Sequence, residues 1–431
     1  MDGELVLRDS VISELQHQPG PAPADPAARA GSGAGQLEAA DVVDYLLGRG
    51  ELEPCDLVHS DFSVEVVDRK NVSFVVHVDG PRLLLKRPRD PRDPGVANEA
   101  AVYVALRQGA HDRGGDDTGA HGPGVAAHDR GVAAHLPAFH FFDPDRQVLA
   151  LEYLPDAPTL RDHHERTGRS PAHIGRATGR VLAALHAMPF GSQWLAAGEP
   201  PPPWALTLLE PPISVLETES SGTLAVLRRI QGSQPLTSAA EGLLERWEAK
   251  SLCHNDVRLD NVLRLGRSGG GGARIVLVDW ELCSPGDGLW DVAGLLAGYV
   301  ELWATHALTA SRLGRPAAAR HSLAAFRPLL RAFWAGYLSA SDGLATEGRA
   351  SDGLATDGRP PWGPDTAVRV TSMIGLRLAQ TALEYSQGSN EATADSLALL
   401  TLAEQFAQRP LERWVHALGL PLGPLSGPIH A

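Results

Sequence analysis

The sequence contains few cysteines and no long apolar run. Its three cysteines, Cys55, Cys253 and Cys283, are too few and too scattered in 431 residues for a disulfide scaffold or a zinc site. The densest apolar run, residues 292–300, is far shorter than the ~18 residues that suggest a membrane span. The first ten residues, MDGELVLRDS, have neither the basic region nor the apolar stretch of a signal peptide. We therefore expect a soluble, cytoplasmic protein.

Positive charge is also scarce. The chain has 38 Lys and Arg residues against 52 Asp and Glu residues, a net charge of −14 at pH 7. This balance argues against nucleic acid or an anionic membrane as a partner. A content of 43% hydrophobic and 21% charged residues is that of a globular chain and excludes disorder throughout. The length predicts two domains or lobes.

Three stretches contain little that can be buried. We expect a flexible N-terminal tail over residues 1–36, a low-complexity insertion over 109–135 and a replicated surface insertion over 341–359, where SDGLATEGRA is followed by SDGLATDGR. The remaining sequence predicts a small lobe over 37–154 and a larger lobe over 155–431.

The hydrophobic patterns of the two lobes differ. In the first, they predict a helix from Val42 that stops at Gly48, a helix over 95–109, and strands over residues 63–68, 72–78, 82–86, 140–142 and 147–154. In the second, they predict two short strands, 252–253 and 275–278. They also predict six helices. One opens with a capping box at Ser238 and contains Trp247, and the other five cover 174–188, 289–305, 318–338, 366–386 and 392–418.

Two short segments carry the residue types that phosphoryl transfer needs. The first is HNDVRLDN (254–261), and the second, after a glycine-rich turn, is IVLVDWE (275–281). Transfer to a hydroxyl needs a carboxylate to take the proton of the acceptor, a cation to offset charge on the transferred group, and oxygen ligands for Mg²⁺. Four residues supply these groups: the base Asp256, the cation Arg258, and the metal ligands Asn261 and Asp279.

HNDVRLDN resembles the H-x-D-x-x-x-x-N catalytic loop of aminoglycoside phosphotransferases and choline kinase-like enzymes, which share the protein-kinase fold. VDWE and the following PGDGLWD (285–291) are similar to the metal-binding strand of that family and the segment after it. The resemblance extends from Leu57 to Ala407, apart from the insertions. It implies a bilobal α+β fold, with a small antiparallel-sheet N-lobe carrying one main helix and a larger, mainly helical C-lobe. It also implies ATP and Mg²⁺ as cofactors.

The same resemblance implies roles for residues in the first lobe. LLLK (83–86) resembles the strand whose lysine, here Lys86, binds phosphates, and Glu99 stands where the family pairs a helix glutamate with that lysine. LALEYL (149–154) resembles the hinge, so the backbone around Glu152 and Leu154 is expected to meet the adenine.

The chain departs from the kinase pattern at two places. The turn after residue 68 has no glycine, although protein kinases place a glycine-rich loop over the phosphates. Arg69, Lys70 and Ser73 either contact the phosphates with their side chains or belong to an ordinary polar hairpin. Asn255 stands where the family has glycine, and we expect it to tolerate the left-handed backbone of that turn. Glu281 either assists the metal or is structural.

The acceptor is less well defined than the reaction. From residue 360 to the end, the sequence has six acidic residues and four arginines. This segment therefore has no concentration of acidic residues that would favour binding of a polycationic aminoglycoside. Three segments, DRKNVSFVV (68–76), NEAAVY (98–103) and PWALTL (203–208), resemble the precursor-peptide Ser/Thr kinases of class V lanthipeptide and thioamide-peptide biosynthesis. That branch implies a peptide substrate and a partner lyase or cyclase. Two alternatives remain open, a small-molecule O-phosphotransferase and an inactive kinase fold that binds peptides.

Overall fold

The chain forms two compact units. The computed structural model describes residues 36–59, 61–68, 70–78, 83–111, 131–155, 157–190, 194, 200–211, 219–266, 273–346, 364–408 and 411–420. Unit 1 comprises Met1–Ala157, Gly191–Gly198 and Val276–Cys283, and unit 2 comprises Pro158–Phe190, Glu199–Ile275 and Ser284–Ala431. The lobe boundaries taken from the sequence stay a prediction. Several expected features lie outside the described residues: the tail before residue 36, the insertions over 112–130 and 347–359, and Arg69.

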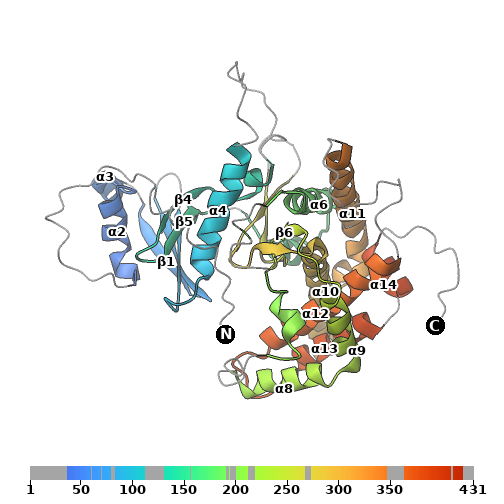
Figure 1. The fold of residues 1–431 in the computed structure, drawn as a ribbon. Coiled ribbons are helices and arrows are strands. Elements are labelled where there is room, and N and C mark those ends of the chain that lie inside the picture. Colours follow the sequence, from blue (N-terminus) through green and yellow to red (C-terminus); the bar gives the residue numbers. More distant parts are fainter. Residues whose placement is uncertain are drawn as a thin grey trace. The chain divides into compact units, whose positions relative to one another are not determined.

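Unit 1 contains a five-stranded antiparallel sheet with the strand order β1-β2-β3-β5-β4 (Figure 1). The strands are β1 (Ser63–Asp68), β2 (Asn71–His77), β3 (Leu83–Pro88), β4 (Phe139–Asp143) and β5 (Val148–Glu152). They are rich in Val, Leu and Phe, which fit a pleated, half-buried surface. All five strands were expected within about two residues of these bounds. Strand β3 pairs on both sides, which places Lys86 opposite Ser73 and Leu149.

Helices accompany this sheet: η2 (Ala39–Asp41), α2 (Val42–Arg49), α3 (Pro54–His59), α4 (Gly95–His111) and η3 (Gly131–His135). Leu46 of α2 belongs to the same apolar cluster as Phe74 and Leu85 of the sheet, and all three are buried. The helix end expected at Gly48 is wrong: Gly50, at φ 74°, is the left-handed cap that bonds the last carbonyls of α2. The end expected at Gly109 is also wrong, since a glycine costs a helix only ~1 kcal/mol.

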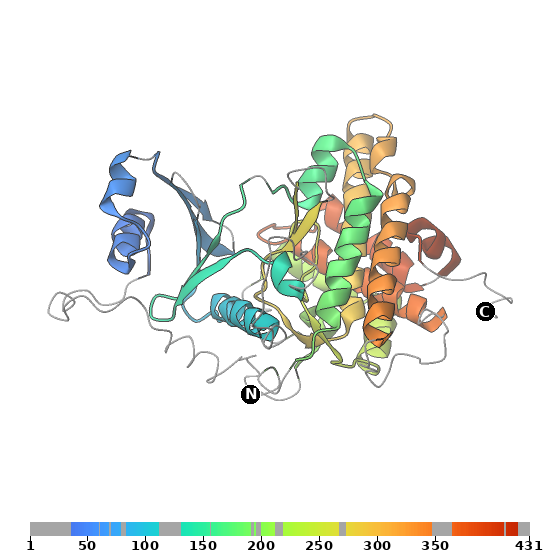
Figure 2. The same cartoon turned by 90° about the horizontal axis from the view of Figure 1, so that it is seen from above.

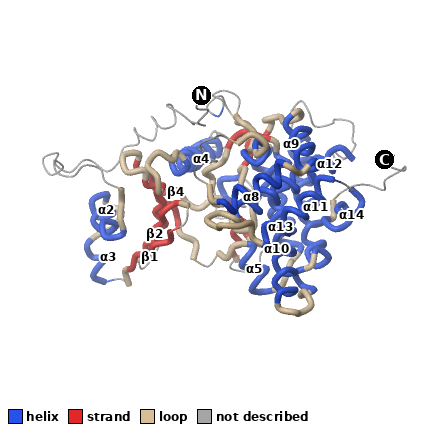
Figure 3. Tube along the Cα trace, turned by 90° about the horizontal axis from the view of Figure 1, so that it is seen from below, coloured by secondary structure: helices blue, strands red, loops and turns tan. Residues whose placement is uncertain are grey.

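Unit 2 is mainly helical (Figure 3). Its helices are α5 (Leu160–Thr167), α6 (Ala172–His186), η5 (Trp204–Thr207), α8 (Ser221–Gln231), α9 (Gln234–Leu244), α10 (Gly288–Arg312), η6 (Ala319–His321), α11 (Leu323–Thr346), α12 (Pro364–Glu384), α13 (Ala394–Gln408) and α14 (Leu411–Leu418). Figure 2 shows α6 and α11 side by side. Helix α10 is buried over most of its length, and it packs against α12.

Two helix predictions in unit 2 are wrong. Helix α9 begins at Gln234, with a proline in its first turn, so Ser238 lies inside the helix and Trp247 lies beyond its end. The single helix expected over 392–418 is divided into α13 and α14, and the sequence between them contains Pro410, which cannot donate to a helical hydrogen bond. Helix α5 was not predicted at all, because its sequence, LRDHHERT, has almost no apolar stripe.

Two small sheets flank the motif segments. Strand β6 (Ser251–Cys253) pairs with β9 (Ser284–Gly286), and β7 (Val262–Leu265) pairs with β8 (Arg274–Leu277). HNDVRLDN therefore connects β6 to β7, and VDWE begins as β8 ends. The expected α+β fold, with a small antiparallel sheet, one main helix beside it and a larger helical part, is confirmed. Among the described helices, none is long and apolar enough to cross a membrane.

Candidate active site

The HNDVRLDN loop opens with a left-handed turn at Asn255. The φ of Asn255 is 63°, in the region that asparagine tolerates better than most residues, so the expectation for this position is confirmed. The backbone N–H groups of His254 and Asn255 both donate to the carboxylate of Asp291, each over 2.8 Å. Asp291 is fully buried on α10. These charge-assisted bonds fix the direction in which the loop leaves β6.

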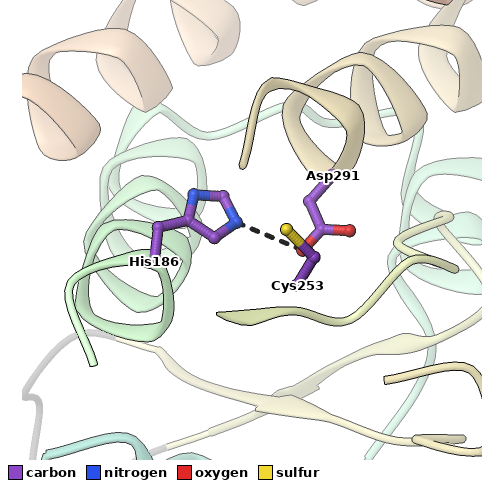
Figure 4. A group of neighbouring side chains, drawn as sticks. All are labelled: His186, Cys253 and Asp291. Atoms are coloured by element: carbon purple, nitrogen blue, oxygen red, sulfur yellow. Dashed lines mark hydrogen bonds and ion pairs between the residues drawn. The ribbon is translucent and has the colours of Figure 1, made fainter. Parts of the chain in front are cut away.

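Asp291 also faces His186 and Cys253 (Figure 4). One ligand atom from each of the three lies within 4.8 Å of the others, which is the spacing of a metal cluster. However, the Asp291 oxygens already accept two N–H groups, and Oδ2 lies 3.1 Å from His186 Nε2. We therefore interpret the cluster as the hydrogen-bonded support of the loop. The signal for it in the sequence was a carboxylate directly before the densest apolar run.

Helix α10 carries the rest of the loop. A Cβ at Gly294 would lie only 2.5 Å from the carbonyl oxygen of Val257, so a larger residue there would force the loop and the helix apart. Val257 and Leu259 of the loop are buried. Asp256 and Arg258, which alternate with these two residues, are half-buried.

Asp256, Arg258 and Asn261 lie together, as the sequence predicted. Asp256 Oδ1 accepts a hydrogen bond from Arg258 Nε at 3.0 Å, and Asp256 Oδ2 accepts one from Asn261 Nδ2, also at 3.0 Å. The same Nδ2 donates to the backbone carbonyl of Asp256. Because the amide nitrogen faces Asp256, the amide oxygen of Asn261 is the atom that remains to bind a cation.

The carboxyl of Asp256 is held in its ionised form. Burial raises its pKa, but the guanidinium groups of Arg258 and Arg377 more than offset that effect, and the pKa of Asp256 lies below its usual range. The side chain can therefore accept a proton at neutral pH. A hydrogen-bond acceptor of this kind suits an acceptor hydroxyl.

Helix α12 contributes two residues that no motif in the sequence indicates, Glu384 and Arg377. Arg258 makes a bidentate ion pair with Glu384, with N–O distances of 2.9 and 3.1 Å. Arg377, two helical turns before Glu384 on the same face of α12, donates to Asp256 Oδ1 at 3.1 Å. Both α12 residues are more than 100 positions from the loop and entered the sequence analysis only as charges in a count.

A cavity of about 240 Å³ lies beside these pairs within unit 2. Its lining comes from the loop, α5, α10 and α12: Arg161, Arg258, Asp260, Gly294, Ala297, Gly298, Glu301, Arg377, Thr381, Glu384 and Tyr385. Arg161 bonds both Asp260 and Glu301, each at 2.9 Å, and Tyr385 also donates to Glu301. The three carboxylates of the lining are therefore all paired with guanidinium groups.

In unit 1, Lys86 connects the two acids that the family resemblance singled out. Its Nζ lies 2.6 Å from Glu99 Oε2 on α4 and 2.5 Å from Asp279 Oδ1, while Glu99 Oε1 accepts from the backbone N–H of Trp280. Burial lowers the pKa of Lys86, but the two carboxylates more than offset it and keep the ammonium charged. Glu99 is buried, whereas the side chain of Asp279 is 37% exposed.

The glycine-free turn is tied to the same segment. Lys70 Nζ lies 2.7 Å from Glu281 Oε1, and Asn71 Nδ2 donates to Glu281 Oε2 at 3.0 Å. Ser73 lies opposite Lys86 in the β2–β3 ladder. Both carboxylate oxygens of Glu281 therefore bond to side chains of the turn, which supports a structural role for Glu281 over a role at the metal.

The expected hinge lies at the end of β5. The Glu152 carboxylate accepts from the N–H of Ala138 at 3.0 Å, and the N–H of Glu152 donates back to the Ala138 carbonyl. The carbonyl of Leu154 accepts from Ala157 at 3.2 Å. These bonds fix the path of the segment after β5, while the role of its backbone toward adenine stays a prediction.

The profile described as APH, phosphotransferase enzyme family, matches residues 67–329, which is more than half of the chain. No curated protein matches the chain.

Several solved structures are similar to this chain. An ethanolamine kinase from Plasmodium vivax is 11% identical with a TM-score of 0.50, and the match covers 84% of this chain and 86% of that one. A choline/ethanolamine kinase family protein from Mesorhizobium loti is 17% identical (TM-score 0.45, 88% and 99% covered), and the choline kinase LicA from Streptococcus pneumoniae is 14% identical (TM-score 0.42, 85% and 99% covered). The match over residues 67–329 shows that the chain belongs to the phosphotransferase enzyme family, and the predicted phosphotransferase class is confirmed.

Proposed function

We propose that the protein transfers the γ-phosphoryl group of ATP to a hydroxyl, with Mg²⁺ as cofactor. The observation that carries the proposal is the position of Lys86, a buried ammonium between Glu99 and Asp279. A lysine fixed by a helix glutamate, beside an exposed carboxylate, offers a cation for phosphates and an oxygen for their metal. If Lys86 and Glu99 only filled space in the core, two apolar side chains would do so without the cost of burying two charges.

Asn261 and Asp279 are the proposed metal ligands. Asn261 bonds to Asp256 through its amide nitrogen, so its amide oxygen can bind the metal. Asp279 accepts from Lys86 through Oδ1, so its Oδ2 can bind the metal. One amide oxygen and one carboxylate fit Mg²⁺, which takes its other ligands from water and phosphates. When bound, the ion neutralises charge on the phosphates.

Asp256 is the proposed general base, and Arg258 the cation beside it. The ionised Oδ2 of Asp256 accepts the proton of the acceptor hydroxyl as its oxygen bonds to the γ-phosphorus and the bond to the leaving ADP breaks. Arg258 is proposed to offset charge on the transferred group, and its Nε also donates to Oδ1 of Asp256 at 3.0 Å and so holds the carboxylate. The bond from Asn261 fixes the rotation of the carboxylate.

The remaining nucleotide contacts are proposed from the first lobe. Arg69, Lys70 and Ser73 contact the phosphates in place of a glycine-rich loop, and the backbone at Glu152 and Leu154 meets the adenine. The pair with Glu281 supports the role of Lys70, because it holds the ammonium near the segment that carries Asp279.

For the acceptor, we propose a Ser or Thr hydroxyl of a ribosomal precursor peptide, as in lanthipeptide-type biosynthesis. The charge balance of the unit 2 cavity supports a peptide over a polycationic aminoglycoside, since Asp260, Glu301 and Glu384 are each already paired with arginine. Trp204 in the PWALTL segment is 45% exposed. A partner lyase and a cytoplasmic location stay predictions from the sequence.

An assay with labelled MgATP distinguishes a peptide acceptor from an aminoglycoside acceptor. The protein is incubated with a Ser/Thr-rich precursor-type peptide or with an aminoglycoside panel, and each product is weighed by mass spectrometry. A gain of about 80 daltons on the peptide alone supports the proposal. A gain on an antibiotic alone overturns it in favour of a small-molecule enzyme.

A third arm tests the inactive scaffold. Calorimetry measures MgATP binding to the wild type and to Asp279→Ala. Metal-dependent binding that is lost in the variant is the expected result, while a wild type that binds no nucleotide and only binds peptide is a scaffold.

A further inference from the structure

The loop and helix α12 are joined in a closed ring of hydrogen bonds. Arg377 donates to Asp256 Oδ1 through one amino group and to Gln380 Oε1 through the other, over 3.1 and 3.0 Å. Gln380 Nε2 donates to Glu384 Oε1 at 3.0 Å, and Glu384 binds the guanidinium of Arg258. Arg258 Nε closes the ring on Asp256 Oδ1. Each side chain of the ring bonds to two others of the ring, and each of these partners carries a charge or an amide group.

The spacing of the three α12 residues explains how one helix builds half of this ring. Positions 377, 380 and 384 are separated by three and four residues, so they lie on one face of the helix. The side chain of Arg377 is only 7% exposed, and its guanidinium lies 5.4 Å from the ring centre of Trp290. It also donates to the carbonyl of Asn255. Arg377 therefore has little freedom to leave its position.

The ring distinguishes the two oxygens of Asp256. Oδ1 accepts from both guanidinium groups, whereas the bond to Oδ2 comes from Asn261. Two fixed donors on one oxygen oppose rotation of the carboxylate about its Cβ–Cγ bond. Oδ2 then keeps one orientation toward an incoming hydroxyl.

We propose that Arg377 is a positioning residue for phosphoryl transfer, acting through Asp256: anchored by Gln380, it holds Oδ1 so that Oδ2 faces the acceptor. The inference rests on the proposed function, since Asp256 must be the base. A purely structural Arg377, one that only joins α12 to the loop, is the competing explanation.

Rates of phosphoryl transfer test the inference. The probe is MgATP with water as acceptor, and phosphate release gives kcat and the KM for ATP. The variants are Arg377→Met, Arg377→Lys, Asp256→Asn and the double variant Asp256→Asn/Arg377→Met. Arg312→Met is the matched control, because it removes an arginine–carboxylate pair, with Asp395, on the exposed face of α10.

Arg377→Met is expected to lower kcat about 10- to 100-fold with little change in the KM for ATP, because a misplaced base slows the chemical step. Arg377→Lys keeps the charge but not the planar fork that bonds Asp256 and Gln380 together, so it is expected to recover only part of the rate. In the Asp256→Asn background, Arg377→Met should cause no further loss, because both changes remove the same function.

Three results overturn the inference. They are an unchanged kcat in Arg377→Met, full recovery by Arg377→Lys, and an equal loss with and without Asp256. Failure of the proposed function looks different: Asp256→Asn itself then keeps the wild-type rate, and the base assignment falls together with the role of Arg377.

Discussion

His164 makes the stability of unit 2 depend on pH. The ring is fully buried on α5, with Nδ1 2.8 Å from the Arg169 carbonyl and Nε2 3.1 Å from the Tyr299 hydroxyl. Nδ1 must therefore donate to the carbonyl, and Nε2 accepts from the hydroxyl in the neutral ring. Burial lowers the pKa of His164 to about 4, and the nearby His163 and His321 add to that effect.

The size of the effect follows from that pKa. A histidine in the unfolded chain has a pKa of about 6.5, so the folded state binds fewer protons than the unfolded state between about pH 6.5 and pH 4. The contribution of His164 to stability is complete above pH 6.5 and decreases as the pH falls through this window. A gap of about 2.5 units corresponds to about 3 kcal/mol at pH 4.

Urea denaturation at pH 7.5, 6.5, 5.5 and 4.5, followed by tryptophan fluorescence, measures the free energy of unfolding. His164→Asn keeps a donor for the Arg169 carbonyl but does not titrate, so its free energy of unfolding should fall less on acidification than that of the wild type. His416→Gln, on the exposed side of α14, is the control and should follow the wild type. Parallel pH curves for wild type and His164→Asn would refute the reasoning.

Four further substitutions test the site. Asp256→Asn should lower turnover at least ~10²-fold, and a near-normal rate in a steady-state assay removes Asp256 from the mechanism. Lys86→Met should weaken MgATP binding measured by calorimetry, because it leaves Glu99 and Asp279 without their cation; equal affinity contradicts its role. Asp291→Ala should destabilise the protein by about 3 kcal/mol in urea denaturation, since it strands two buried N–H donors, and a loss below about 1 kcal/mol would contradict the support role. Glu281→Gln should raise the KM for ATP by less than about 5-fold, because the pair with the exposed Lys70 is worth about 1 kcal/mol or less; a larger rise would show that Glu281 touches the metal.

The strands and the motif loop could be predicted because their signals are local. Alternation of Val, Leu and Phe marks the sheet of unit 1, and the spacing within HNDVRLDN already places Asp256 and Asn261 on one short loop. Helix ends were less predictable. Gly48 and Gly50 are equally good stop signals in the sequence, and only the left-handed φ of Gly50 decides between them.

The support of the loop could not be predicted, because its partners are distant in the sequence. The PGDGLWD segment draws attention to Asp291 but not to its partners, because its bonds to the N–H groups of His254 and Asn255 arise from the packing of α10 under the loop. Arg377 and Glu384 resemble ordinary helix charges seven residues apart. That they share a helix face indicates a role only once the structure shows Arg377 bonded to Asp256 and Glu384 bonded to Arg258.

Carboxylates that lie close together in the unit 2 cavity are distant in the sequence. Six acids against four arginines after residue 360 indicated no acidic concentration, but two of the three cavity carboxylates, Asp260 and Glu301, come from elsewhere. Our proposal for the acceptor depends on the pairs that Arg161 makes with Asp260 and Glu301 and that Arg258 makes with Glu384. A polycation would have to displace guanidinium groups that are already bidentate or shared, and it would gain little Coulomb energy in exchange. An acceptor with neutral donors and acceptors, such as a peptide backbone, can bond to the same groups without breaking the pairs.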